Sequence, residues 1–229
     1  MKQSRVRVLL IGSKGRMGKT IIDLAKSDPK IDIVAQCDLG DAVKLAMKNC
    51  DVVIDFSQAD AIEEICCAAL QHRQSLVIGT TGHSPEQRRI IEKAAESLPI
   101  VFASNFSVGV NVLFALTHRA GEILGGEFAP EISETHHQMK KDAPSGTAKT
   151  LAEILQKARK IDDQIPIQSI REGDVVGDHT VIFSGPGERL ELTHRAFSRE
   201  IFARGALRAV EWITRKPPGL YSMQDVLGL

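Results

Sequence analysis

The 229-residue sequence has few aromatic side chains and no excess of charge of either sign. Aromatic residues make up 4% of the chain, and 29 Lys and Arg residues balance 29 Asp and Glu residues. The balanced composition provides no global positive field that would attract nucleic acid or an anionic membrane surface. We therefore expect neither of these partners, and an anionic ligand would have to be held by a local arrangement of donors.

Cysteine is scarce as well, and the long apolar runs of membrane-spanning helices are missing. The four cysteines form neither a CxxC pair nor a Cys/His spacing typical of metal sites, so we expect reduced structural thiols in a cytoplasmic protein. Every uninterrupted apolar run falls far short of the roughly 20 residues of a membrane span. Residues 1–5 lead directly into a strand-like segment, without the pattern of a signal or transit peptide.

The first half of the chain alternates strand and helix signals. Short apolar runs rich in β-branched residues predict strands, and amphipathic segments between them predict helices. We expect strands at 6–11, 31–36, 51–56, 76–78 and 100–103, and helices at about 17–26, at 41–48, from Asp60 and from Ser84. This order predicts right-handed βαβ units and a parallel sheet that is covered on both faces.

Two of these helix starts have capping signals. Asp60 followed by Glu63 has the spacing of a capping box, in which two side chains satisfy the free N–H groups of a helix start. Ser84 is followed by Pro85 at the first helical position and by Gln87 at the third. We expect both helices to begin at these residues.

The pattern changes near residue 107. Helices are expected at about 110–124 and 147–159, a strand at 131–137, and a last helix at about 200–214, before a short tail. Between them, the stretch 167–193 has alternating segments divided by Ser-Gly-Pro-Gly at 184–187, which indicates antiparallel sheet and turns. The predicted fold class is α/β: a Rossmann-type parallel-sheet nucleotide domain followed by a smaller α+β domain.

A glycine turn at residues 12–18 follows the first predicted strand. Gly12, Gly15 and Gly18 fit G-x-x-G-x-x-G, in which glycines allow a tight turn and close approach of a pyrophosphate to a helix N-terminus. Asp38 ends the second strand, twenty residues after Gly18, where a carboxylate would bind the adenosine ribose hydroxyls. The alternative is a plain strand-to-helix turn with a solvated Asp38.

The residues around Asp38 also bear on the choice of nucleotide. An acid at this position favours a free ribose 2′-hydroxyl and would repel a 2′-phosphate. Leu39 offers no compensating cation, although Lys14 and Arg16 lie in the glycine turn. We expect both nucleotides to be used, with NADH at least as good as NADPH.

Further polar turns follow the later strands, at the sheet edge where α/β proteins bind ligands. The Gly-Thr-Thr-Gly turn at 79–82 would meet the nicotinamide ribose and carboxamide. Phe56-Ser57 and the segment 103–106 end neighbouring strands and are similarly placed. An ordinary loop is the alternative at each position.

The segment 134–148 concentrates two histidines, two lysines and a Ser-Gly-Thr helix start. Backbone N–H groups at such a start suit a carboxylate, a lysine supplies a second anion contact, and histidine is the natural proton donor near neutral pH. Together they suit a small dicarboxylate. The alternatives are a solvated loop or a metal fragment from His136 and His137; because no further ligand stands at a supporting spacing, we expect no metal.

These motifs resemble those of the dihydrodipicolinate reductase family, in order and along essentially the whole chain. The resemblance is carried by the glycine turn, Asp-Phe-Ser at 55–57, Gly-Thr-Thr-Gly at 79–82, Asn-Phe-Ser-Val-Gly-Val-Asn at 105–111, the His-His block at 136–148, Gly-Glu-Arg-Leu-Glu-Leu-Thr-His at 187–194 and the tail at 219–227. It implies reduction of the dehydrated form of 4-hydroxy-tetrahydrodipicolinate to tetrahydrodipicolinate in diaminopimelate and lysine biosynthesis. NADH or NADPH would supply the hydride, and a proton would add to the neighbouring carbon.

The resemblance assigns roles residue by residue. His136 matches the proton donor of the family, and Lys140 matches the lysine that binds a substrate carboxylate. Substrate-binding positions fall on His137, Ser145, Gly146 and Thr147. The expected cofactor-binding residues, from the turns and the resemblance together, are Gly12, Lys14, Gly15, Arg16, Met17, Gly18, Asp38, Phe56, Gly79, Thr80, Thr81, Ser104, Asn105 and Phe106.

The resemblance also implies an architecture and an assembly. Residues 1–107 and 200–229 would form the dinucleotide-binding domain, with the helix from Glu200 beside its other helices. Residues 108–199 would form a substrate-binding domain whose sheet builds a homotetramer, and a hinge would close the two domains.

This chain departs from the family pattern at a few positions. Leu39 replaces an Arg of longer members, Met139 replaces a third histidine of some members, and two connecting regions are compact. None of these departures involves His136 or Lys140. The alternative functions are another Rossmann dehydrogenase, such as an aspartate dehydrogenase, and a non-enzymatic nucleotide sensor.

Overall fold

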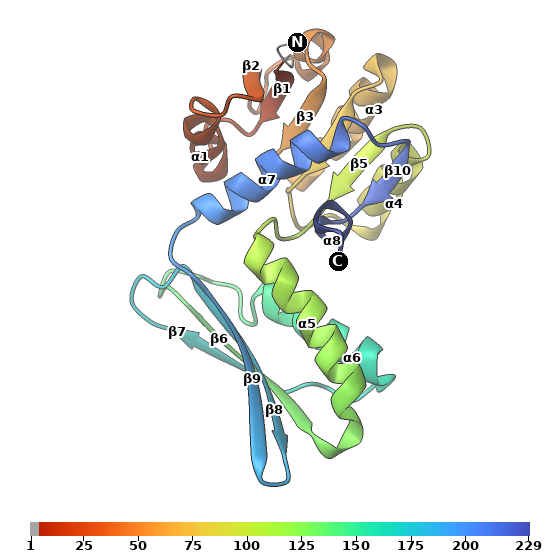
Figure 1. The fold of residues 1–229 in the computed structure, drawn as a ribbon. Coiled ribbons are helices and arrows are strands. Elements are labelled where there is room, and N and C mark those ends of the chain that lie inside the picture. Colours follow the sequence, from red (N-terminus) through yellow and green to blue (C-terminus); the bar gives the residue numbers. More distant parts are fainter. Residues whose placement is uncertain (1–4) are drawn as a thin grey trace. The chain divides into compact units, whose positions relative to one another are not determined.

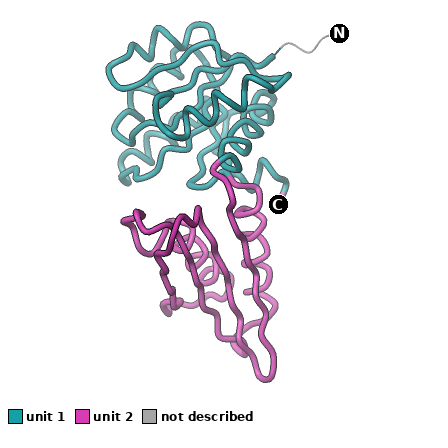
Figure 2. The backbone as a smooth tube through the Cα atoms, turned by 90° about the vertical axis from the view of Figure 1, so that its left-hand side faces the viewer, with its two compact units in different colours: residues 1–106, 200–228 teal, residues 107–199, 229 magenta. Residues whose placement is uncertain are grey.

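The chain builds one unit, leaves it for a second and returns to the first (Figure 2). A computed structural model describes residues 5–229, so the expectation for residues 1–4 lies outside it. The first unit contains the residues up to Phe106 together with Glu200–Gly228, and the second contains Ser107–Arg199. Among the described residues, no helix combines the length and apolar character needed to cross a membrane.

The first unit is organised around a parallel sheet in the order β10-β5-β4-β3-β1-β2 (Figure 1). Its strands are β1 (Val6–Ile11), β2 (Ile31–Cys37), β3 (Val52–Asp55), β4 (Ser75–Ile78), β5 (Pro99–Phe102) and β10 (Gly219–Tyr221). Leu9 and Leu10 in β1 are both fully buried, although they point to opposite faces. Each such side chain contributes about 1.5–3 kcal/mol through burial. The inner strands β3 and β4 are therefore buried along almost their whole length, because both faces of the sheet are covered, whereas the edge strand β2 also has exposed residues.

Two groups of helices cover these faces. Leu9 packs into a core with α2 (Val43–Ala46), α3 (Ile62–His72) and α4 (Pro85–Ala95). Leu10 packs into a second core with α1 (Arg16–Ala25), α7 (Glu200–Ile213) and α8 (Met223–Leu227). The predicted helix from Glu200 thus packs beside α1, as expected.

Most predicted elements of this unit are confirmed, and two details were wrong. Ser84 forms the capping box with Gln87, but Asp60 lies in the 3₁₀ turn η2 (Ala59–Ala61), and α3 begins after Ala61 without a side-chain cap. Asp60 instead accepts a hydrogen bond from Gln87 Nε2 at 3.1 Å. No strand or helix was predicted in the tail, yet it contains β10 and α8; a three-residue strand is too short to show a period.

The second unit is a mixed sheet packed against two helices. Its strands are β6 (Ala129–His136), β7 (Ile167–Arg171), β8 (Gly177–Gly185) and β9 (Glu188–Ala196), in the order β7-β6-β8-β9. α5 (Val108–Leu124) and α6 (Gly146–Arg159) lie on one side of it (Figure 1) and share its apolar core.

The antiparallel pairing expected across 167–193 is confirmed only in part. β8 pairs with β6 and β9 in antiparallel fashion, but β7 pairs parallel to β6. The reason is the connection: α6 lies between β6 and β7, and a helical crossover returns the chain in the same direction.

Candidate active site

The glycine turn has the close approaches for which its glycines were expected. Gly12 has a φ of +84°, and a Cβ there would lie 2.3 Å from the Phe56 carbonyl oxygen. A Cβ on Gly18 would lie 2.2 Å from the Gly12 carbonyl oxygen. α1 begins at Arg16, and its N-cap Gly15 has no side chain to accept from the first N–H groups. Backbone donors at the start of α1 are therefore suited to an anion.

Asp38 is held against this turn and is not a loop acid free in solvent. Its carboxylate accepts hydrogen bonds from Ser13 Oγ at 2.6 Å and from Lys14 N at 3.1 Å. Asp41 Oδ2 in turn accepts from the backbone N–H of Asp38 at 2.8 Å. Ser13 and Asp41 were not predicted as site residues, since neither is a glycine of the pattern G-x-x-G-x-x-G or the acid that follows it.

A cavity of about 390 Å³ lies beside the turn and Asp38. Its described lining residues include no lysine or arginine but four acids: Asp38, Asp41, Asp60 and Glu64. Leu39, which also lines it, is 92% exposed. The electrostatic environment of this cavity is therefore unfavourable to an additional phosphate group.

The ends of β3, β4 and β5 meet at the same sheet edge. The rings of Phe56 and Phe106 are in contact, with centroids 5.7 Å apart, and a Cβ on Gly79 would lie 2.3 Å from the Phe56 ring. Asp55 is buried, which raises the pKa of its carboxyl, and it accepts from Ser57 N at 2.9 Å. The other expected cofactor residues of these turns are the buried Thr80, the exposed Thr81 and Ser104, and the partly buried Asn105.

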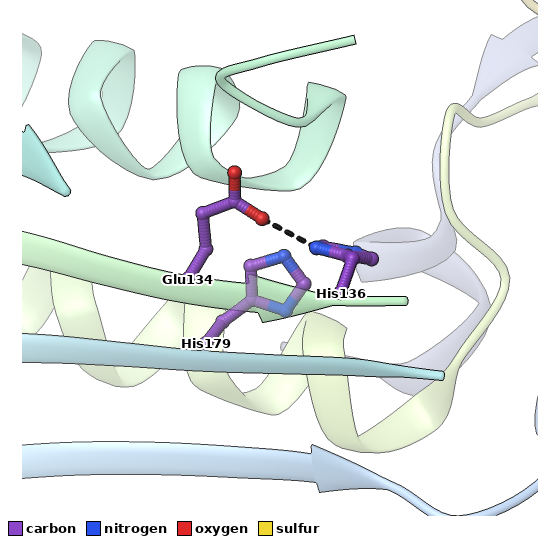
Figure 3. A group of neighbouring side chains, drawn as sticks. All are labelled: Glu134, His136 and His179. Atoms are coloured by element: carbon purple, nitrogen blue, oxygen red, sulfur yellow. Dashed lines mark hydrogen bonds and ion pairs between the residues drawn. The ribbon is translucent and has the colours of Figure 1, made fainter. Parts of the chain in front are cut away.

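In the second unit, three titratable side chains form a buried histidine cluster: Glu134, His136 and His179 (Figure 3). Their exposed fractions are 1%, 8% and 4%. Glu134 and His136 are two residues apart on β6 and so share a face of the sheet, while His179 is the β8 partner of Glu134. His136 Nδ1 donates to Glu134 Oε2, and the rings of the two histidines are in edge contact.

The Glu134 carboxylate is held in place because both of its oxygens accept hydrogen bonds. Oε1 accepts from Arg171 Nη2 at 2.9 Å and from the backbone N–H of Ser145 at 3.3 Å. Burial alone would raise the pKa of Glu134, but the hydrogen bonds from Arg171 and His136 outweigh this effect and lower it. The carboxylate is therefore ionised at neutral pH and acts as an acceptor toward His136 Nδ1.

The two histidines are both shifted toward the neutral form. Burial lowers the pKa of His136, while the Glu134 carboxylate acts in the opposite direction. Burial and the neighbouring His136 lower the pKa of His179 to about 3. His179 is therefore uncharged at neutral pH and adds no charge to the cluster.

The start of α6, which follows the histidine cluster in the chain, is capped by Ser145. Ser145 Oγ accepts from Ala148 N at 3.2 Å and lies 3.1 Å from His179 Nε2, and its side chain is buried. Ser145 thus joins α6 to the histidine cluster, whereas Gly146 is exposed and Thr147 is partly buried. Gly146 is therefore the most exposed residue of this helix start.

Lys140 and His137 lie on the loop between β6 and α6. Lys140 Nζ forms an ion pair with Asp142 Oδ1 at 2.8 Å, which lowers the pKa of Asp142. His137 Nε2 lies 3.4 Å from Arg199 Nη2, so this ring is not part of the histidine cluster. Lys140 therefore places one cationic group close enough to the buried carboxylate–imidazole pair to lower the pKa of His136.

Glu134, Arg171 and His179 were not among the site residues predicted from the sequence. The spacing of Glu134 and His136 on a strand was a usable signal, since alternate residues share a face. Arg171 and His179 are paired with β6 through strand register, which no short motif reveals.

The histidine cluster also bears on the prediction that the protein binds no metal. Sequence spacing offered no third ligand for His136 and His137, yet potential ligand atoms of Glu134, His136 and His179 lie within 4.8 Å of one another. Arg171 already forms an ion pair with Glu134, so we interpret the three side chains as a hydrogen-bonded Glu134–His136 pair with the His179 ring in edge contact.

Sequence comparisons match both halves of the chain to one family. The model described as "Dihydrodipicolinate reductase, N-terminus" matches residues 6–106, and "Dihydrodipicolinate reductase, C-terminus" matches residues 109–227. A 4-hydroxy-tetrahydrodipicolinate reductase from Akkermansia muciniphila is 48% identical over 98% of each chain. The corresponding reductase from Zymomonas mobilis is 43% identical over 100% of this chain and 99% of its own.

Solved structures show the same fold. A dipicolinate-bound dihydrodipicolinate reductase from Paenisporosarcina sp. TG-14 matches with a TM-score of 0.83 and 23% identity, over 96% of this chain and 98% of its own. An aspartate dehydrogenase from Thermotoga maritima matches less well, with a TM-score of 0.51 and 14% identity, over 90% of this chain and 96% of its own. The expected fold class is thus confirmed.

Proposed function

The chain belongs to the dihydrodipicolinate reductase family, and we propose that it reduces the dehydrated form of 4-hydroxy-tetrahydrodipicolinate to tetrahydrodipicolinate. The observation that carries this proposal is the buried Glu134–His136 pair beside Lys140 and the start of α6, in a chain that matches such reductases along its length. A carboxylate-held histidine beside cationic and N–H groups suits proton transfer to a small dicarboxylate heterocycle.

The nicotinamide nucleotide would be held by the first unit. The cradle of Gly12 and Gly18, where a Cβ would collide with backbone, fits a pyrophosphate at the start of α1. Asp38 would bind the adenosine ribose, and the turns around Phe56, residues 79–81 and residues 104–106 would surround the nicotinamide end. Bound there, the nucleotide supplies the hydride.

NADH is proposed to be at least as good a reductant as NADPH. Four acids line the cavity beside Asp38, and its described lining residues include no lysine or arginine. A 2′-phosphate would gain no cation from this lining and would face like charges. Lys14 and Arg16, in the glycine turn, are the cations that would permit some use of NADPH.

The substrate would be held by residues 108–199. Lys140 would exchange its ion pair with Asp142 for one substrate carboxylate, and the helix start at Gly146 and Thr147 would bind another through N–H groups. His137 would add a contact, and Ser145 would contribute as the cap that holds the helix start. His136 would supply the proton to the carbon next to the one that receives hydride.

The assembly and location of the protein are part of the same proposal. One face of the second sheet packs on α5 and α6; the other exposes polar contacts such as the Thr180–Thr193 hydrogen bond of 3.0 Å. We infer that this face forms the contacts of a cytoplasmic homotetramer in diaminopimelate and lysine biosynthesis. Light scattering at two protein concentrations tests the assembly, and a stable monomer would contradict it.

The activity is tested by following nicotinamide oxidation while a synthase makes the substrate from pyruvate and aspartate semialdehyde. Substrate-dependent oxidation of NADH supports the proposal. Folded protein that binds nucleotide without turnover would favour a nucleotide sensor. Reduction of the oxidised nucleotide that depends on added aspartate would favour an aspartate dehydrogenase.

A further inference from the structure

Glu134 is a buried charged side chain that is paired with His136 but takes no part in the proposed reaction itself. Its carboxylate is 1% exposed and makes three hydrogen bonds. We propose that Glu134, fixed by Arg171, is a positioning residue that holds His136 with its Nδ1 proton retained and leaves Nε2 as the nitrogen that delivers the proton to the substrate. This inference rests on the proposed role of His136 as proton donor.

The geometry restricts the imidazole to one orientation. Both residues belong to β6, whose backbone is paired on both sides, by β7 and by β8. Glu134 cannot rotate without breaking its bonds to Arg171 and Ser145, and His136 Nδ1 is bonded to its remaining oxygen. A carboxylate accepts but does not donate, so the proton on Nδ1 stays there in both charge states of the ring.

The charges around His136 give Glu134 a second effect. The groups that act on this ring are Glu134 from its own strand, Arg171 from β7 and Lys140 from the following loop. His179 from β8 contacts the ring but is neutral, because its pKa is about 3. Glu134 is thus the one negative group among them, and it supports the imidazolium form against two cations and burial.

Gly177 lies next to Nε2, the other ring nitrogen of His136, and has no side chain that would fill the space there. A Cβ on Gly177, at the start of β8, would lie 3.0 Å from His136 Nε2 and 3.3 Å from Cδ2. The backbone of Gly177 is not in the left-handed region, so its conformation does not require glycine. The missing side chain therefore leaves room at Nε2, the nitrogen that Glu134 does not bind.

These contacts define the proton step. The Nε2–H bond of the imidazolium breaks and a C–H bond forms on the substrate carbon adjacent to the site of hydride addition. His136 is left neutral with its Nδ1 proton bonded to Glu134, and solvent returns a proton to Nε2. Substrate is reduced by the nicotinamide hydride, so this step is proton transfer alone.

The first test is Glu134→Gln, which keeps the size and an acceptor oxygen but removes the charge. Because the imidazolium loses its negative neighbour, the pH above which kcat/KM declines should fall by about one unit or more, and kcat at neutral pH should fall about 100-fold. The KM for NADH should stay unchanged. Glu134→Asp should recover part of the pH shift, and Glu153→Gln, on the exposed side of α6, is the matched control that changes neither quantity.

Comparison with His136→Gln separates this inference from the proposed function. Loss of turnover in His136→Gln together with a wild-type pH profile in Glu134→Gln would overturn the role of Glu134 and leave the proton donor in place. Wild-type turnover in His136→Gln would instead overturn the proton donor itself.

A second measurement uses the wild-type protein and so does not depend on how a variant folds. Imidazole ¹⁵N spectra, with the His136 signals assigned through His136→Gln, report which nitrogen carries the proton in the neutral ring. The expected result is protonation at Nδ1 throughout and titration at Nε2. A neutral ring protonated at Nε2 would refute the proposal.

Discussion

In the glycine turn the groups that would meet a ligand are backbone atoms, whereas the histidine cluster is built from side chains of different strands. The turn works because Gly12 and Gly18 have no Cβ, so N–H groups and carbonyls approach closely. The cluster works because register in a mixed sheet brings Arg171 beside His136 and His179 beside Glu134. A local motif suffices to specify the first kind of site, and only the folded sheet specifies the second.

The largest effect is expected from a substitution that removes the proposed proton donor, His136, and leaves the glycine turn intact. We expect His136→Gln to lower kcat by about 10²–10⁴-fold, the usual contribution of general acid catalysis. The Kd for NADH, measured by fluorescence titration, should stay the same because every expected nucleotide-binding residue lies in the other unit. A parallel loss of nucleotide affinity would mean that the two sites are not separable in this way.

The converse change acts on the turn alone. In Gly18→Ala a methyl group would lie 2.2 Å from the Gly12 carbonyl oxygen, so the backbone of the turn must shift. We expect the Kd for NADH to rise by about tenfold or more, equivalent to about 1.4 kcal/mol, with the imidazole titration of His136 unchanged. Gly126→Ala, where nothing lies within 4 Å of the added carbon, is the control. Unaltered NADH affinity in Gly18→Ala would argue against the pyrophosphate site.

The two sites also differ in how far the sequence predicts them. The glycine turn, Asp38 and the parallel strands were predictable because each is a contiguous pattern, and the structure contains them at nearly the expected residues. Strand β10 was missed because three residues are too few to show a period. The predicted antiparallel direction of β7 was wrong, because the helical connection through α6 makes β7 parallel to β6. Glu134 stood two residues from His136, but its engagement by Arg171 depends on strand register.

A smaller effect is expected at Asp38, whose side-chain charge would discriminate between NADH and NADPH at a site otherwise formed by backbone groups. Asp38→Asn removes a negative charge from the cavity wall, so the ratio of kcat/KM for NADPH to that for NADH should rise about tenfold. The amide keeps an acceptor for Ser13 and Lys14, which limits disturbance of the turn. Asp23→Asn, an exposed acid of α1 paired with Lys26, is the control. An unchanged ratio would show that Asp38 does not discriminate between the nucleotides.

The smallest effect concerns how the burial of His179 makes the free energy of unfolding depend on pH. The folded-state pKa of His179 is about 3, against 6.5 in the unfolded chain, so its contribution to stability is fully present above pH 6.5 and is lost as the pH falls toward 3. His83, His136 and His194 also have lowered pKa values and act in the same direction. Between about pH 7.5 and 5.5, His179 alone should cost about 1 kcal/mol of unfolding free energy.

Denaturant unfolding of His179→Gln at the two pH values isolates this contribution. The variant should be less sensitive to acid than the wild type by about 1 kcal/mol, because glutamine does not titrate. His118→Gln, a half-exposed position on α5, is the matched control and should retain the wild-type pH dependence. If His179→Gln kept the full acid sensitivity, His179 would have to accept a proton in the folded state. The charge around His136 would then include a third cation, and the single carboxylate of Glu134 would no longer suffice to support its imidazolium.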